Sequence, residues 1–197
     1  MLALPPAPAP PRPRLLLVGT ALVCAAGSML FTGLLAIYLQ ARETAGGTTA
    51  AWFPRGVQVP EIAANILVIT MIGAVIVASW AVYAVRRGAR TDAYVALAAL
   101  AIFGIAVLNA QVYIWRQMKV GLLKPAGQPF PLYFYSTTGT LFAALLTGIV
   151  FTAVVVFRTL GGHSTPKDSE GLMALTLYWY FLAAATVAVW FVVYVNK

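Results

Sequence analysis

The stretch from Gly171 to Val195 constrains this chain most, because its twenty-five consecutive residues include no Asp, Glu, Lys, Arg or His. At about 1.5 Å per residue, a helix of this length reaches about 37 Å and crosses a hydrocarbon core of about 30 Å with some tilt. The stretch is therefore predicted to be a transmembrane helix.

A run of four aromatic residues lies roughly 10 to 15 Å along this predicted helix, deeper than the headgroup region where Trp and Tyr usually settle. Phenol and indole groups at that depth need hydrogen-bond partners, and lipid tails offer none. We therefore expect this face to pack on protein, either on other helices of the chain or on a second subunit. The residues of the run are Tyr178, Trp179, Tyr180 and Phe181.

The composition extends this prediction to the whole chain. Hydrophobic residues make up 61% of the sequence and charged residues only 9%, against about 25% charged residues in globular proteins. We predict an all-α integral membrane protein with one five-helix domain over residues 15–197, preceded by a disordered Pro-rich tail over residues 1–14. The predicted spans are 15–39, 62–85, 93–115, 132–157 and 171–195.

The net charge of +8 raises the possibility of nucleic-acid binding, but the thirteen Lys and Arg residues are scattered through the loops and tails. A membrane protein with basic loops explains this distribution without a nucleic-acid partner. Seven basic residues fall on the side of the N-terminus and six on the other. This bias predicts a multi-pass protein of the cell inner membrane with a cytoplasmic N-terminus and an outside C-terminus.

Several residues within the spans are predicted to serve helix or subunit packing. The amides of Asn109 and Gln111 are expected to join helices, with a substrate contact as the alternative. The fourth span has one row of small residues at Gly139, Ala143 and Thr147 and a second row beside it. Small residues spaced four apart allow helices to approach closely. The second row consists of Thr140, Ala144 and Gly148.

The first span is also rich in small residues, so we expect it to be packed on at least two sides. In the loop that follows it, Trp52 is predicted to be an interfacial aromatic residue.

The chemistry available inside the spans is limited, because they contain no histidine and a single cysteine, Cys24. Haem and copper need a cluster of His, Cys, Met or Tyr ligands, and all five acids fall in predicted loops or at span edges. The remaining histidine, His163, is predicted to be a surface loop residue. We therefore expect no catalytic, cofactor-binding or metal-binding residues in this chain, and we interpret it as a subunit. A stand-alone permease or assembly factor is the alternative from another class.

Several stretches resemble subunit III of the haem-copper oxidases in its five-span bacterial form. SMLFTGLLAIYLQAR (28–42) resembles the first-span pattern of that family, and Pro60 and Asn65 fit the opening of the second span. LNAQVYIWR (108–116) is similar to the Gly-Gln-x-x-Glu-Tyr region. FYSTTGTLFAAL (134–145) resembles the Tyr-x-x-Thr-Gly-x-His-Gly-x-His stretch, and LYWYF (177–181) resembles the final Tyr-Trp-His-Phe motif.

The sequence departs from the motifs of this family wherever they carry an ionisable side chain inside the membrane. Any family role of those groups in lipid binding or proton entry is therefore not expected here in the same form. The residues of this chain at those positions are Gly27, Ile114, Leu141, Ala144, Tyr180 and Ala183.

The resemblance implies a non-catalytic membrane subunit of an aerobic cytochrome c oxidase complex. It implies that the chain packs on the haem-copper catalytic subunit I, on other oxidase subunits and on phospholipid, and that haem and copper are bound by the partner. A subunit III-like companion of a nitric oxide reductase remains the alternative within this class.

Overall fold

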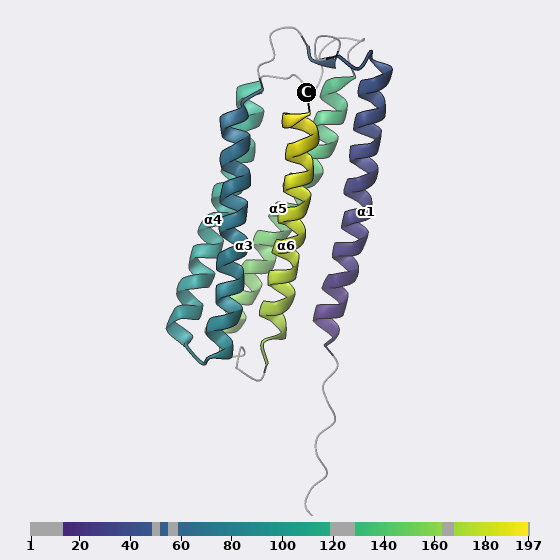
Figure 1. The fold of residues 1–197 in the computed structure, drawn as a ribbon. Coiled ribbons are helices and arrows are strands. Elements are labelled where there is room, and N and C mark those ends of the chain that lie inside the picture. The colour runs from purple at the N-terminus through teal and green to yellow at the C-terminus, as the bar shows by residue number, and fades with distance from the viewer. Residues whose placement is uncertain (1–13, 49–51, 55–58, 119–128, 163–167, 197) are drawn as a thin grey trace, which may run out of the picture.

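The computed structural model describes residues 14–48, 52–54, 59–118, 129–162 and 168–196, which form an upright bundle of long helices (Figure 1). The helices are α1 (Leu15–Thr44), α3 (Glu61–Arg86), α4 (Arg90–Met118), α5 (Phe130–Leu160) and α6 (Glu170–Trp190), and α6 continues as the π-helical turn η1 (Phe191–Val195). Five helices are long and apolar enough to cross a membrane, which confirms the predicted all-α architecture. The predicted tail and His163 lie outside the described residues, apart from Arg14 of the tail.

Each helix is longer than the span predicted for it, when α6 is taken together with η1, because polar residues at the ends continue the helices beyond the apolar core. The helices of 26 to 31 residues reach about 39 to 46 Å, against a hydrocarbon core of about 30 Å. Pro60 directly precedes α3, as predicted. The short turn between α3 and α4 uses Gly88 at φ +75°, a conformation that residues with a Cβ rarely adopt.

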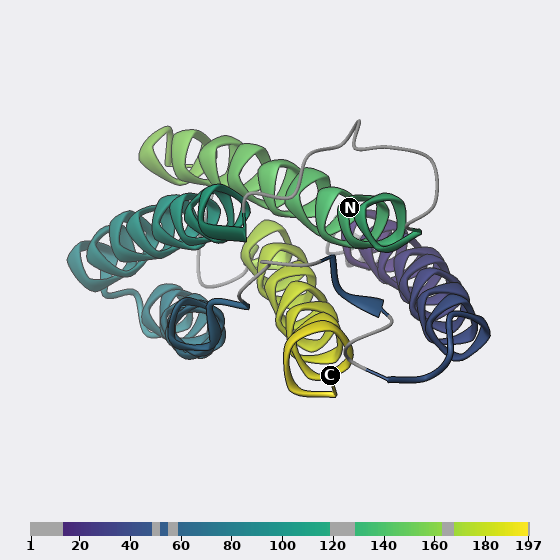
Figure 2. The same ribbon diagram turned by 90° about the horizontal axis from the view of Figure 1, so that it is seen from above.

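The last helix, α6, holds the central position in the bundle (Figure 2). It packs against α1, α3 and α5, whereas α3 and α4 form a closely packed pair at one side. Half of the most apolar part of α6 is buried within the chain, against about a tenth for α1. The uncharged stretch from Gly171 to Val195 therefore lies on the helix that joins α1, α3 and α5.

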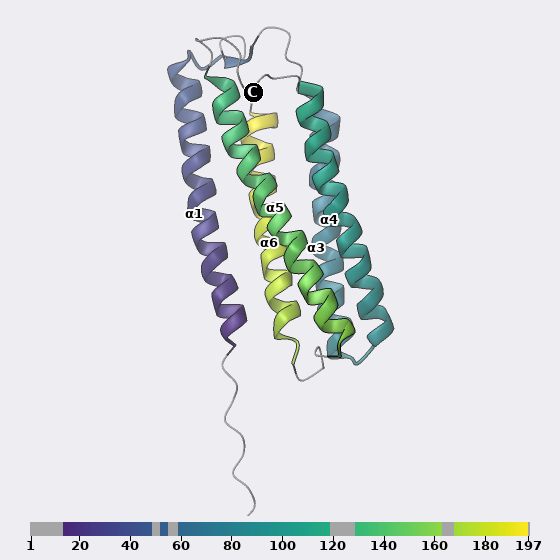
Figure 3. The same cartoon turned by 180° about the vertical axis from the view of Figure 1, so that it is seen from behind.

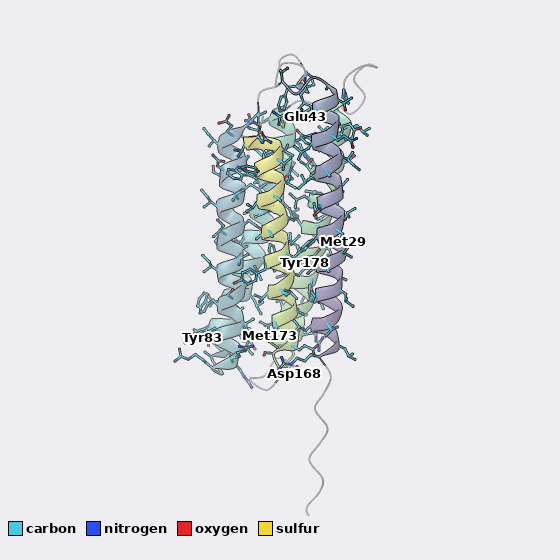
Figure 4. All side chains as sticks on the ribbon, turned by 45° about the vertical axis from the view of Figure 1, so that its right-hand side comes forward. Met29, Glu43, Tyr83, Asp168, Met173 and Tyr178 are labelled. Carbon is cyan, nitrogen blue, oxygen red and sulfur yellow. The ribbon has the colours of Figure 1, made fainter. Side chains whose placement is uncertain are left out.

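Within this chain, helix α1 packs along a single stripe, and the expectation that it is packed on at least two sides stays a prediction. Its outer surface is open, and Met29 is 78% exposed there (Figure 4). This stripe faces the neighbouring helices α5 and α6, because α1 lies at the edge of the bundle. The buried residues of this stripe are Thr20, Cys24, Phe31, Tyr38 and Arg42.

Hydrogen bonds to distant parts of the chain hold both ends of α1 in place. At its start, the Leu17 N–H donates a hydrogen bond of 3.0 Å to the carboxylate of Glu170 in the first turn of α6. At its end, the Arg42 guanidinium donates to the carbonyl oxygen of Asn196, just beyond η1. These contacts satisfy backbone groups that a helix terminus leaves without partners, and the charges have the signs that the helix dipoles favour.

Trp52, which is predicted to be an interfacial aromatic residue, is 1% exposed and packs inside the chain. Its indole N–H donates a hydrogen bond of 3.0 Å to the Tyr38 hydroxyl, and its ring meets that of Phe130 edge to face. The loop after α1 therefore folds back over the space between α1 and α5 and closes one end of the bundle with aromatic rings.

Candidate functional site

The four aromatic residues predicted to pack on protein form the centre of the fold, and we call them the aromatic hub. They are consecutive on α6, and successive residues of an α-helix point about 100° apart. Four residues therefore cover the whole circumference of the helix, and each contacts a different part of the bundle. The hub consists of Tyr178, Trp179, Tyr180 and Phe181.

Trp179 is the most enclosed member of the hub, with no exposed surface. Its indole N–H donates a hydrogen bond of 3.1 Å to the Thr152 hydroxyl on α5. Its ring lies so close to Gly104 of α4 that a Cβ on this glycine would be 3.1 Å from a ring carbon. Trp179 thereby fixes the distances among three helices, and its one polar atom has a partner.

Tyr178 joins α6 to α5 and is 6% exposed (Figure 4). Its hydroxyl donates a hydrogen bond of 3.0 Å to the backbone carbonyl of Ala144. Close approach of the helices makes this bond possible, because a Cβ on Gly148 would lie 2.8 Å from a methyl group of Leu182 and 3.3 Å from the Tyr178 ring. The second predicted row of small residues on α5 is therefore the one that packs inside the chain.

Phe181 connects the hub to α1. Its ring occupies the space that a side chain at Gly27 would need, since a Cβ there would be 2.6 Å from the ring. The Phe31 ring of α1 also packs beside it, with a centroid distance of 6.1 Å. The position that the resemblance links to a membrane glutamate is therefore occupied by a glycine against an aromatic ring, and a carboxylate has no room there.

Tyr180 points outward from the chain, so its predicted packing on a second subunit stays a prediction. Its side chain is 52% exposed, and its hydroxyl lies 3.0 Å from the Ser79 hydroxyl on α3. A second polar pair bridges the same two helices, from the Trp190 indole N–H to the Asn65 side-chain oxygen at 2.9 Å. The Ser79 hydroxyl donates a hydrogen bond of 2.9 Å to the Val75 carbonyl, so the Tyr180 hydroxyl is the donor to Ser79 and has a partner inside the chain.

The row Gly139, Ala143 and Thr147 lies on the outer surface of α5. A Cβ on Gly139 would meet no other atom within 4 Å, and Ala143 and Thr147 are exposed. Figure 3 shows that no other helix of the chain covers α5 from this side. The role of this row in helix or subunit packing therefore stays a prediction.

The two amides of α4 point in opposite directions. Gln111 is 1% exposed and faces the interior, whereas Asn109 is exposed on the outer side of the helix. Residues two apart lie about 200° apart around an α-helix, so both cannot serve the same contact. Within the described part of the chain, the Asn109 side chain makes no hydrogen bond.

The other positions where the resemblance implied ionisable groups also have apolar contacts. Ile114 and Leu141 are fully buried, and Ala144 uses its backbone carbonyl to accept the Tyr178 bond. Within the described ranges, no group of three His, Cys, Asp or Glu side chains is placed to hold a metal ion. The sequence does not indicate that Arg42 caps the C-terminal helix, because its partner Asn196 lies 154 positions away along the chain.

This geometry defines a class: a multi-pass helical membrane protein whose central helix is held by neutral aromatic, small-residue and hydrogen-bond contacts. Residues 14–197 match the family model of cytochrome c oxidase subunit III, and the chain belongs to this family. The prediction of a non-catalytic subunit of an oxidase complex is thereby confirmed.

Relatives in several bacteria are similar to almost the whole chain. The cytochrome c oxidase subunit 3 of Corynebacterium diphtheriae is 24% identical over 183 residues, with 93% of this chain and 89% of that protein covered. A probable cytochrome c oxidase subunit 3 of Mycobacterium tuberculosis has the same identity and coverage. One from Nocardia farcinica is 24% identical over 192 residues.

Proposed function

We propose that this chain packs on the haem-copper catalytic subunit I of its oxidase complex through the outer face of α5, and that it stabilises that subunit. The observation that carries the proposal is the outer row of Gly139, Ala143 and Thr147. Among the described residues, a Cβ on Gly139 would meet no other atom within 4 Å, and the small side chains of Ala143 and Thr147 are exposed. Small residues on a membrane helix allow another helix to approach closely, whereas contact with lipid alone does not require them.

Asn109 on the neighbouring helix α4 supports the same contact. Its amide lies about 13 Å below the end of α4 at Met118, which places it within the hydrocarbon region of the bilayer. An amide exposed to lipid lacks hydrogen-bond partners, so a polar group on a partner helix would stabilise it. In this proposal, haem and copper are held by the partner subunit, and this chain supplies a rigid surface.

Copurification with variants of the outer row tests this proposal. Gly139→Leu together with Ala143→Leu should strongly reduce the haem absorbance that a tagged chain brings down in mild detergent. Gly19→Leu is the matched control, because a Cβ at Gly19 also meets no atom within 4 Å but lies on α1. If both variants recover the same amount of haem and the isolated chains are equally stable, the proposal that the outer face of α5 contacts the catalytic subunit would be rejected.

We also propose that the start of α1 faces the cytoplasm and that the chain lies in the bacterial plasma membrane. The support is the excess of one basic residue on that side, seven against six, under the positive-inside rule. A reporter that is active only outside the cytoplasm should work when fused after Lys197, and activity only of a cytoplasmic reporter would reverse the orientation.

A further inference from the structure

The buried amide of Gln111 has a polar atom that the packing of the helices leaves without a partner. The side chain is 1% exposed and lies on the inner face of α4, yet among the described residues its Nε2 has no hydrogen-bond partner. Buried polar atoms in folded proteins are almost always hydrogen-bonded, and in a membrane protein lipid cannot supply the bond. This atom therefore marks a place where a hydrogen-bonding molecule would be stabilised.

A second atom of this kind comes from η1, the π-helical turn at the end of α6. The Tyr194 side chain is 6% exposed, and within the described part of the chain its hydroxyl also has no hydrogen-bond partner. In a continued α-helix, Tyr194 would lie about 140° around the axis from the buried Val189. The wider turn, closed by the hydrogen bond from the Asn196 N–H to the Phe191 carbonyl, brings the ring back toward the interior.

The two side chains face each other across α4 and η1. The Tyr194 hydroxyl interacts with the Gln111 side chain, but the two groups do not meet at the distance and angles of a direct hydrogen bond. The Phe134 ring lies edge to face with Tyr194, at a centroid distance of 6.5 Å, and closes the site from α5. Two buried polar groups that are near each other but not directly bonded are a usual setting of a bridging water.

We propose that Gln111 and Tyr194 bind one water molecule that joins α4 to the end of α6. The Gln111 Nε2–H would donate to the water oxygen, and the Tyr194 hydroxyl would complete the bridge as acceptor or donor. Both groups are neutral, so the site suits an uncharged molecule rather than an ion. The π-helical turn of η1 places the second hydrogen-bonding group, the Tyr194 hydroxyl, at the site.

A high-resolution cryo-EM map of the purified oxidase complex tests the proposal directly. We expect an isolated peak within hydrogen-bonding distance of both Gln111 Nε2 and the Tyr194 oxygen. A direct bond between the two side chains with no such peak would overturn it, and so would density continuous with a lipid chain.

The unfolding equilibrium of the isolated chain provides a second test. Gln111→Leu and Tyr194→Phe should each lower the ratio of folded to unfolded chain by roughly tenfold, because each leaves the other group buried and without its bridge. The double variant should lose much less than the product of the two effects. Asn109→Leu is the matched control on the outer side of α4 and should change the ratio little. If the double variant lowers the ratio by the product of the two single effects, the two residues act separately and the proposed bridge is contradicted.

Discussion

Substituting Trp179 tests the aromatic hub most sharply, because this side chain is fully buried and its one polar atom has a partner. Trp179→Phe keeps a six-membered ring but removes the hydrogen bond to Thr152. In membrane proteins such bonds contribute on average about 0.6 kcal/mol, with a maximum of about 1.7 kcal/mol. The smaller ring also vacates about 40 Å³, and at about 24 cal/mol per Å³ the cavity adds about 1 kcal/mol.

The variant should therefore lose about 2 kcal/mol of unfolding free energy. The assay is reversible unfolding of the purified chain in mixed detergent micelles, followed by far-ultraviolet circular dichroism. Trp80→Phe is the matched control, since Trp80 is 41% exposed on α3 and should change stability by less than about 0.5 kcal/mol.

A double-mutant cycle with Thr152→Val separates the hydrogen bond from the cavity. The hydroxyl of Thr152 accepts the Trp179 bond and also donates to the Gly148 carbonyl at 2.8 Å. If the first bond is stabilising, the double variant should be less destabilised than the sum of the single variants. An effect of Trp179→Phe no larger than that of Trp80→Phe would refute the reasoning about the hub.

Two further predictions concern the other contacts of α6. Tyr178→Phe should destabilise the chain by about 1 kcal/mol, because the Tyr178 hydroxyl donates to a buried carbonyl. Tyr180→Phe, on the exposed side of α6, should have a smaller effect in the same unfolding assay. Equal effects of the two substitutions would contradict the assigned orientations. Glu170→Ala should remove the cap on Leu17 and destabilise the start of α1 by about 0.5 to 2 kcal/mol, seen as faster amide hydrogen exchange there than in a Glu43→Ala control.

The sequence predicted the number, type and order of the helices because uncharged runs of more than twenty residues have few alternatives to crossing a bilayer. It also placed the aromatic run of α6 at a depth where hydrogen bonds are required. Tyr178 and Trp179 do form such bonds inside the chain. These features follow from length and polarity, which a single sequence contains.

The direction in which each residue faces could not be predicted in the same way. The two rows of α5 have the same composition, and only the position of α6 decides that Gly148 is enclosed while Gly139 is open. Helical geometry separates Asn109 from Gln111 but does not say which one faces inward. The burial of Trp52 depends on Phe130, a residue 78 positions further along the chain, and no local pattern indicates that contact.

The most direct measurement of the central claim is the visible spectrum of the tagged chain, recorded first in the complex purified with mild detergent and again after the chain has been separated from it. The account predicts haem absorbance in the intact complex, which stays with the partner subunits and leaves this chain colourless. A haem-free complex, or haem that remains with the separated chain, would contradict it.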